Sequence, residues 1–146
     1  MHLTLETDYA MRIVFCLAKN QRRMDAASIS EEMHVTLRFS LKILGKLAGA
    51  GIVNSYKGIK GGYELAHPAE EITLRQVVEA IEGRSYAISR CIVPDGECSR
   101  DRWGCCSFQK VWRDISDEVN VHMDRVNFAQ LVQEDEALRQ GKKQEE

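Results

Sequence analysis

Apolar residues recur at helical spacing in three segments near the start of the chain. In TDYAMRIVFCLAKN, positions 10, 13, 14, 17 and 18 share one face, and Thr4 or Thr7 can cap the helix. AASISEEM predicts a short second helix, and His34 and Val35 form a turn before a third helix, TLRFSLKILGKLAGAG. Thr36 can cap this third helix, positions 40, 43, 44 and 47 face a core, and Gly49 and Gly51 end it.

Two strand-like runs, IVNSY and YELA, follow the third helix and are joined by a tip rich in lysine and glycine. They predict a β-hairpin with a basic tip. TLRQVVEAIEG then offers a capping box of Thr73 and Gln76, an apolar face and a stop at Gly83. This order of helices and hairpin is typical of a winged helix-turn-helix, whose third helix enters the major groove of DNA.

A longer amphipathic helix is predicted in SFQKVWRDISDEVNVHMDRV, whose apolar stripe runs across about five turns. After so small a domain this helix has little of its own chain left to cover. We expect it to pack against a second copy in a symmetric dimer, and the alternative is that it folds back on its own domain. The expected interface residues are Val111, Trp112, Ile115, Val119, Met123 and Val126.

The predicted fold class is mainly α with a small β-hairpin wing: a winged helix-turn-helix plus a long C-terminal dimerisation helix. We expect a DNA-binding domain at 1–83, a cysteine-rich loop at 84–106, the dimerisation helix with a terminal helix at 107–132, and a polar tail at 133–146. NFAQLV predicts the last helical turn or two. A chain of 146 residues can bury such a core without disulfides.

The charge pattern supports a nucleic-acid partner although the net charge is −2. No Asp or Glu occurs between Met33 and Tyr63, so the overall acidic balance hides a basic patch. Recognition helices read bases with their N-terminal residues, and an arginine fork binds guanine best. The base-reading candidates are Thr36, Arg38, Ser40 and Lys42. We expect Lys46 to take phosphate, Lys57 and Lys60 to reach the minor groove or the backbone, and Gly61 and Gly62 to allow close approach.

The N-terminus lacks a secretion signal, and the most apolar run, AMRIVFCLA, is short and interrupted by Arg12. We therefore expect a cytoplasmic protein with no membrane partner. In that reducing compartment clustered cysteines bind metal or sense redox state more often than they form structural bridges. Four of the five cysteines lie within RCIVPDGECSRDRWGCC, whereas Cys16 lies among apolar residues and is expected in the core.

The segments LTLETDYAMRIVFCLA, GIVNSYKGIKGGYELA and ITLRQVVEAIEG, with the cysteine loop and WRDISD, resemble the Rrf-two superfamily of bacterial transcription regulators over residues 1–132. The resemblance implies a dimeric winged-helix repressor or activator, many members of which hold an iron–sulfur cluster, [2Fe–2S] or [4Fe–4S], on three cysteines per subunit. The implied ligands are Cys91, Cys98 and one of an adjacent pair. In the family the third ligand lies six residues before the position that matches Trp112, which favours Cys106. Equal spacing, with six residues between successive cysteines as between Cys91 and Cys98, favours Cys105 instead.

A fourth ligand is implied by the same resemblance. IscR-like members carry a histidine where this chain has Gln109, whereas NsrR-like members share its T-D-Y-A start, in which an aspartate from the partner subunit completes the cluster. The matching residue here is Asp8, whose ordinary alternative is a first-turn acid favoured by the helix dipole. A carboxylate holds cluster iron less firmly than a thiolate and leaves it open to small molecules.

The resulting hypothesis is a dimeric regulator whose affinity for a double-stranded DNA operator depends on a cluster that senses nitric oxide, redox state or iron–sulfur status. The alternative is a clusterless winged-helix regulator that uses its cysteines as a thiol switch, or answers to a metabolite or partner protein. Zinc fits the cysteine spacing poorly, and a loop that has lost its cofactor is a further alternative. No stretch matches a hydrolase or transferase site, so an enzyme is not expected.

Overall fold

A computed structural model describes residues 3–144. Residues 1–2 of the predicted DNA-binding domain and residues 145–146 of the predicted tail lie outside the described range. Within that range the chain is mainly helical with one two-stranded antiparallel sheet, as predicted. In chain order the elements are α1 Leu5–Asn20, α2 Ala26–Met33, α3 Leu37–Gly49, β1 Val53–Tyr56, β2 Gly62–Leu65, η1 Ala69–Glu71, α4 Leu74–Glu82, η2 Arg90–Ile92, α5 Ser107–Arg125 and α6 Phe128–Gln144.

Local polar groups set the ends of the first three helices. Thr4, one of the two expected caps, accepts the N–H of Thr7 at the start of α1. α2 ends at His34, a non-glycine residue with φ 55° whose N–H bonds back to the last turn of the helix. Thr36 caps α3 as predicted, by accepting the N–H of Phe39. These ends produce the tight turn between α2 and α3 that a helix-turn-helix requires.

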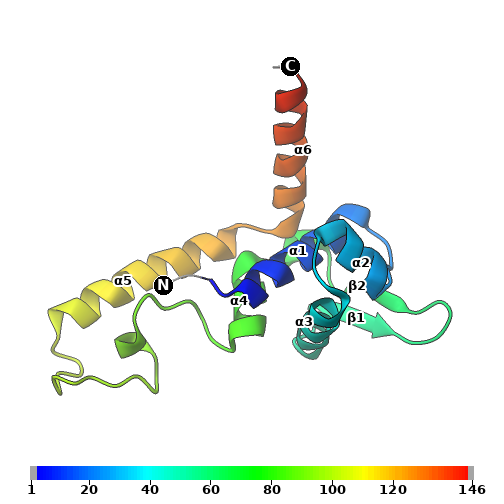
Figure 1. Cartoon of the computed structure of the whole chain (residues 1–146). Coiled ribbons are helices and arrows are strands. Elements are labelled where there is room, and N and C mark those ends of the chain that lie inside the picture. Colours follow the sequence, from blue (N-terminus) through cyan, green and yellow to red (C-terminus); the bar gives the residue numbers. More distant parts are fainter. Residues whose placement is uncertain (1–2, 145–146) are drawn as a thin grey trace.

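The hairpin pairs Val53 with Leu65 and Tyr56 with Gly62, and it projects from the body as a wing (Figure 1). Its second strand also pairs with the segment between α1 and α2, through two backbone bonds of 2.7 and 2.9 Å between Tyr63 and Met24. Gly62 has φ 131°, and a Cβ there would lie 2.6 Å from the carbonyl oxygen of Met24. A glycine is therefore required for this pairing.

One hydrophobic core joins α1, α3, α4 and the hairpin. The predicted capping box of Thr73 and Gln76 begins α4, and Gly83 ends it with φ 72°. The faces predicted for α1 and α3 are both buried, as the spacing of their apolar residues requires. The core includes Ile13, Leu17, Ile43, Leu44, Leu47, Ile72, Val77 and Phe128.

The face of α5 that packs against its own chain is largely polar. Its buried residues are Gln109, Ser116, Asn120 and Met123. Ser116 accepts the N–H of Ile88 at 3.0 Å, and Asn120 bonds both the N–H and the carbonyl of Tyr86 at 3.1 and 2.8 Å. These bonds hold the segment after α4 along α5, so α5 uses its polar face within the chain.

The predicted apolar stripe of α5 lies mostly beside this polar face. Val111 is 47% exposed, and Trp112, Ile115, Val119 and Val126 are half-buried. Met123 differs, because it is 9% exposed and is buried within its own chain. A partly exposed apolar stripe on a long helix is typical of an interface with another chain.

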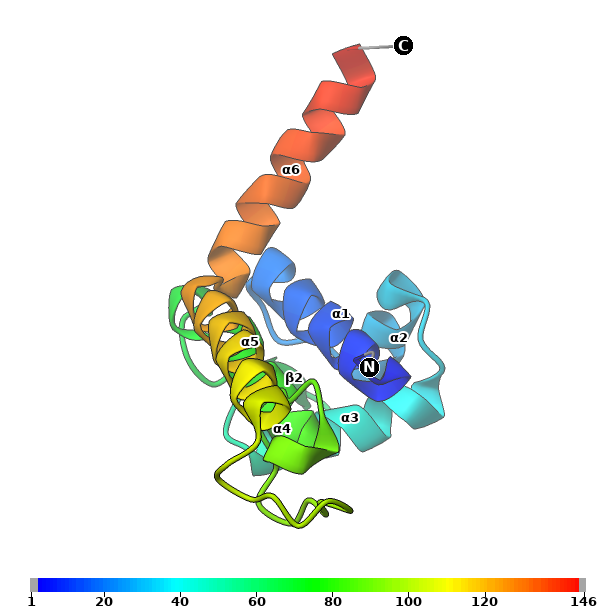
Figure 2. The same ribbon diagram turned by 90° about the vertical axis from the view of Figure 1, so that its left-hand side faces the viewer.

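The C-terminal helix is longer than predicted and belongs partly to the winged domain. We expected only a helical turn or two before a polar tail, but α6 continues to Gln144 because the tail is rich in good helix formers. Its first residue, Phe128, is buried in the core and donates its N–H to the carbonyl of Ile72 at 3.1 Å. The C-terminal half of α6 extends away from the body (Figure 1, Figure 2).

Candidate nucleic-acid interface and cysteine loop

The outward face of α3 carries most of the predicted DNA-contacting residues. Arg38 and Lys42 are exposed, and Lys46 is half-buried one turn further along. Thr36 is also exposed, although its hydroxyl already caps the helix. The first turns of α3 therefore present two cations at the end of the helix that reads bases in this class of fold.

The prediction that Ser40 reads a base is wrong. Ser40 has no accessible surface, since it lies in the same stripe as Ile43, Leu44 and Leu47 and faces the core. That stripe was visible in the sequence, where position 40 was already part of it. The hydroxyl cannot reach a base edge without unfolding α3.

Two leucines on α3 belong to the exposed surface and were missed. Leu37 and Leu41 flank Arg38 and Lys42, and both are exposed. The signal was their phase, because neither falls on the buried stripe of the helix. Exposed apolar side chains at such positions can contact the methyl group of thymine.

The wing presents the two predicted lysines, Lys57 and Lys60, both exposed at its tip. Ile59, for which the hairpin pattern predicts no role, is fully exposed between them. A Cβ on Gly61 would lie 2.6 Å from the carbonyl oxygen of Tyr56, so this glycine is needed for the turn of the hairpin itself. Gly62 is needed instead for the close pairing with Met24, and neither glycine by itself indicates contact with DNA.

Arg23 anchors the wing to the loop between α1 and α2. Its guanidinium donates to the carbonyl of Lys60 at 3.1 Å, pairs with Glu64 at 3.3 Å and lies 3.4 Å from the centre of the Tyr56 ring. These partners come from both strands and the tip of the hairpin. No sequence pattern predicts this role, because the contacts join residues more than thirty positions apart.

Gln109 closes the two ends of the cysteine loop. Its side-chain N–H donates to the carbonyl of Cys91 at 2.9 Å, and its carbonyl accepts the N–H of Gly104 at 3.0 Å. This residue stands where the resemblance places a histidine ligand in IscR-like members. Here it is buried and both ends of its amide are bonded, so it acts as a clamp on the loop.

The four loop cysteines differ in their surroundings. Cys91 and Cys98 are half-buried, and backbone N–H groups of Arg102 and Arg100 lower the pKa of Cys98 below its ordinary value. Cys105 is exposed, and its thiol points to the carbonyl of Arg102 at 3.7 Å. Cys106 is half-buried at the N-cap position of α5.

The loop is not arranged as a finished metal site. Among residues 3–144 no three His, Cys, Asp or Glu side chains come close enough to bind one metal ion. The donors are nonetheless of the right kind, because several thiols on one loop suit cluster iron. Asp8, the predicted fourth ligand, is half-buried in the first turn of α1 and pairs with Arg12 at 2.8 Å.

The first turn of α1 contacts two other helices. Thr4 donates to Glu82 of α4 at 2.6 Å, and the hydroxyl of the buried Thr7 also bonds Glu82. On the other side, Glu6 pairs with Lys46 at 2.9 Å and with Lys42 at 3.3 Å. The pKa of Glu6 lies below its ordinary value chiefly because of the Lys46 ammonium group. The turn that carries Asp8 is thus tied to both α4 and α3.

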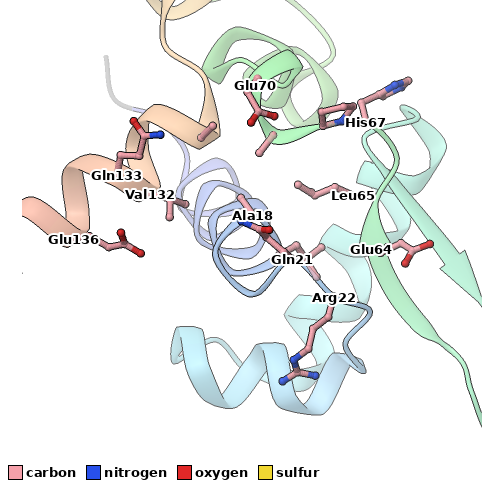
Figure 3. A pocket seen from close by; sticks show the side chains of 14 residues that line it. Ala18, Gln21, Arg22, Glu64, Leu65, His67, Glu70, Val132, Gln133 and Glu136 are labelled. Atoms are coloured by element: carbon pink, nitrogen blue, oxygen red, sulfur yellow. The ribbon is translucent and has the colours of Figure 1, made fainter.

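A pocket of about 480 Å³ opens between the end of α1, the segment after β2 and α6 (Figure 3). Its walls combine apolar residues with charges of both signs, among them Arg22, Glu70 and Glu136. The side chains that line it come from neither α3 nor the cysteine loop.

A helix-turn-helix with a basic third helix and a basic hairpin defines the winged-helix class of DNA-binding transcription regulators. Within that class, residues 3–134 match the model of the Rrf2 family, described as iron-dependent transcriptional regulators, and the chain belongs to this family. The protein is a transcription regulator and not an enzyme. Along residues 3–144 no helix is both long and apolar enough to cross a membrane.

Known proteins similar to the chain include regulators of two kinds. The transcriptional regulator IscR of Photorhabdus laumondii is 29% identical over 140 residues, which cover 94% of this chain and 83% of that protein. The oxidized form of Staphylococcus aureus CymR is 26% identical with a TM-score of 0.67 and covers 90% and 96% of the two chains. T. potens IscR shares the fold at 18% identity with a TM-score of 0.71 and covers 92% and 88%.

Proposed function

We propose that this protein is a homodimeric regulator that binds a near-palindromic operator through α3 and the wing and adjusts its affinity through the chemistry of the cysteine loop. The observation that carries the DNA-binding part is the exposed basic surface made by Arg38, Lys42, Lys57 and Lys60. A symmetric dimer would place two copies of α3 about 34–36 Å apart, one turn of DNA. The apolar stripe of α5 supplies the surface for that dimer.

Arg38→Ala is expected to weaken binding to an operator by about ten- to a hundredfold, because a bidentate arginine–guanine contact contributes about 1–3 kcal/mol. The measurement is a titration of a duplex that the wild-type protein selects from a random-sequence pool. The loss should be smaller on a random duplex, where no base is read. Arg139→Ala is the matched control, since it removes the same charge from α6, where Arg139 pairs with Asp135. An equal effect of both variants would contradict the role given to Arg38.

For the cysteine loop we propose an iron–sulfur cluster held by Cys91, Cys98, Cys106 and Asp8 of the partner subunit. When bound, such a cluster supplies iron that reacts with nitric oxide or oxygen. The half-buried position of Cys106 at the start of α5 supports it over the exposed Cys105, because a ligand on a rigid element is better positioned. The three loop cysteines would hold the cluster, and Gln109 fixes the two ends of their loop. Asp8 pairs with Arg12 through Oδ2, which leaves its other carboxylate oxygen as the ligand atom.

Protein purified without oxygen is expected to show a broad absorbance band between about 320 and 460 nm, with iron and sulfide in similar amounts. Cys98→Ser and Cys106→Ser should lose the band, whereas Cys105→Ser should keep it. Cys105→Ser is therefore the matched control for Cys106→Ser, because the two cysteines are neighbours in the sequence. Loss of the band in Cys105→Ser with retention in Cys106→Ser would reverse the assignment of the third ligand.

A second candidate is a clusterless thiol switch. The lowered pKa of Cys98 favours its reactive thiolate, and a relative of known structure has an oxidized form. Hydrogen peroxide would take two electrons and two protons from Cys91 and Cys98, which form a disulfide while the peroxide becomes water. Colourless protein that resists reconstitution but gains this disulfide in peptide mapping would support the switch. Unchanged operator binding with all four loop cysteines replaced by serine would exclude both mechanisms and leave a metabolite or partner protein as the signal.

A further inference from the structure

A single carboxylate in the first turn of α1 engages two lysines of the recognition helix. Oε1 of Glu6 lies 2.9 Å from Nζ of Lys46 and 3.3 Å from Nζ of Lys42. This oxygen has almost no accessible surface, and the Glu6 side chain is 20% exposed. Ion pairs with one partly buried partner are screened less by salt than fully exposed pairs.

The same two ammonium groups are those that α3 offers to DNA. Lys42 is the more exposed of the two and lies beside Arg38 on the outward face, while Lys46 lies one turn further along. A DNA phosphate and the Glu6 carboxylate are both anions, so they compete for these ammonium groups. A negative charge so close also reduces the positive potential that α3 presents before contact.

We propose that Glu6 is an intramolecular competitor of the DNA backbone, which occupies Lys42 and Lys46 and thereby lowers operator affinity and its dependence on salt. The inference rests on the proposed role of α3 in binding DNA. It adds a residue that the helix-turn-helix pattern does not reveal and that acts in the opposite direction to the basic patch.

The position of Glu6 also suggests how affinity is regulated. Asp8 follows it by two residues, and Thr7 between them is buried and bonded to Glu82 of α4. If Asp8 binds the partner subunit's cluster, as proposed above, that contact would be made by the same turn of α1 whose Glu6 pairs with Lys42 and Lys46. Movement of this turn would change how strongly Glu6 pairs with Lys42 and Lys46, and so how much positive charge α3 offers to DNA.

Glu6→Gln is expected to tighten DNA binding about five- to twentyfold, because each copy in a dimer frees two lysines and each of these partly buried ion pairs contributes only a few-fold. The slope of log affinity against log salt should steepen by about 2, one unit for each charge removed. Both a random-sequence duplex and the selected duplex should gain similarly, because phosphates are common to both. The matched control is Glu71→Gln, which removes the same charge from η1, an element that packs against α6.

A double-mutant cycle separates competition from a general effect of charge. In a Lys42→Gln, Lys46→Gln background the Glu6→Gln change should add nothing, because its partners are gone. A gain that persists in this background, or one that Glu71→Gln reproduces, would overturn the proposal. So would unchanged or weaker binding by folded Glu6→Gln protein while Arg38→Ala still lowers affinity. If Arg38→Ala has no effect either, the role of α3 itself fails.

Discussion

Val119→Asp is expected to be a monomer, if α5 forms the proposed dimer interface, and to bind the operator more weakly by about a hundredfold or more. Val119 lies in the half-buried apolar stripe of α5, with Ile115 one turn before it. An aspartate there would bury an unpaired charge in the interface, and the monomer would lose the second half-site of the operator. Sedimentation and titration of the selected duplex measure the two effects.

Val121→Asp is the matched control for this prediction. Val121 is 46% exposed and lies on α5 about 160° from Val119, at 100° per residue. The Val121→Asp variant should keep the oligomeric state and the DNA affinity of the wild-type protein. Val111→Asp, at a position 47% exposed in the single chain, should break the dimer without harming the fold. Dimers that survive both Val119→Asp and Val111→Asp would show that α5 is not the interface.

Phe128→Ala is expected to lower the free energy of unfolding by about 3–5 kcal/mol, the usual cost of removing a fully buried aromatic side chain. Phe128 is 1% exposed and fills the core between α1 and the segment before α4, although it is the first residue of the terminal helix. Urea unfolding followed by circular dichroism measures the change.

Leu138→Ala provides the comparison on the same helix. Leu138 is 68% exposed in the part of α6 that extends from the body, so its truncation should change stability by no more than about 0.5 kcal/mol. Similar losses from both variants would mean that α6 is stabilised along its whole length. A loss below about 1 kcal/mol in Phe128→Ala would remove α6 from the core of the winged domain.

Helix ends, the hairpin and the fold class were predictable because they depend on neighbouring residues. The helix ends depend on residues that bond backbone groups within one turn of themselves: Thr36, Thr73 with Gln76, and Gly83. Short stretches of sequence are therefore enough to predict them. Ser40 shows the limit of reading residue type without phase, because a polar residue on the buried stripe was assigned to the surface.

The candidate site was only partly predictable for a related reason. The exposed cations of α3 and the wing follow from their positions in these elements. The conformation of the cysteine loop depends instead on hydrogen bonds that Gln109 of α5 makes to both ends of the loop. The sequence has Gln109 where the resemblance implies a histidine ligand. In the fold the side-chain amide of Gln109 bonds Cys91 and Gly104. The apolar stripe of α5 was visible, whereas the burial of the polar face beside it was not.

The sequence by itself determined a mainly α winged helix-turn-helix, a basic third helix and hairpin, and a loop rich in thiols. Each of these depends on periodicity, capping or composition over a few turns of chain. Only the tertiary structure decided that Glu6 faces the lysines of α3, that Arg23 holds the wing and that Phe128 closes the core. These contacts join residues more than thirty positions apart, and their energy exists only once the elements have packed against one another.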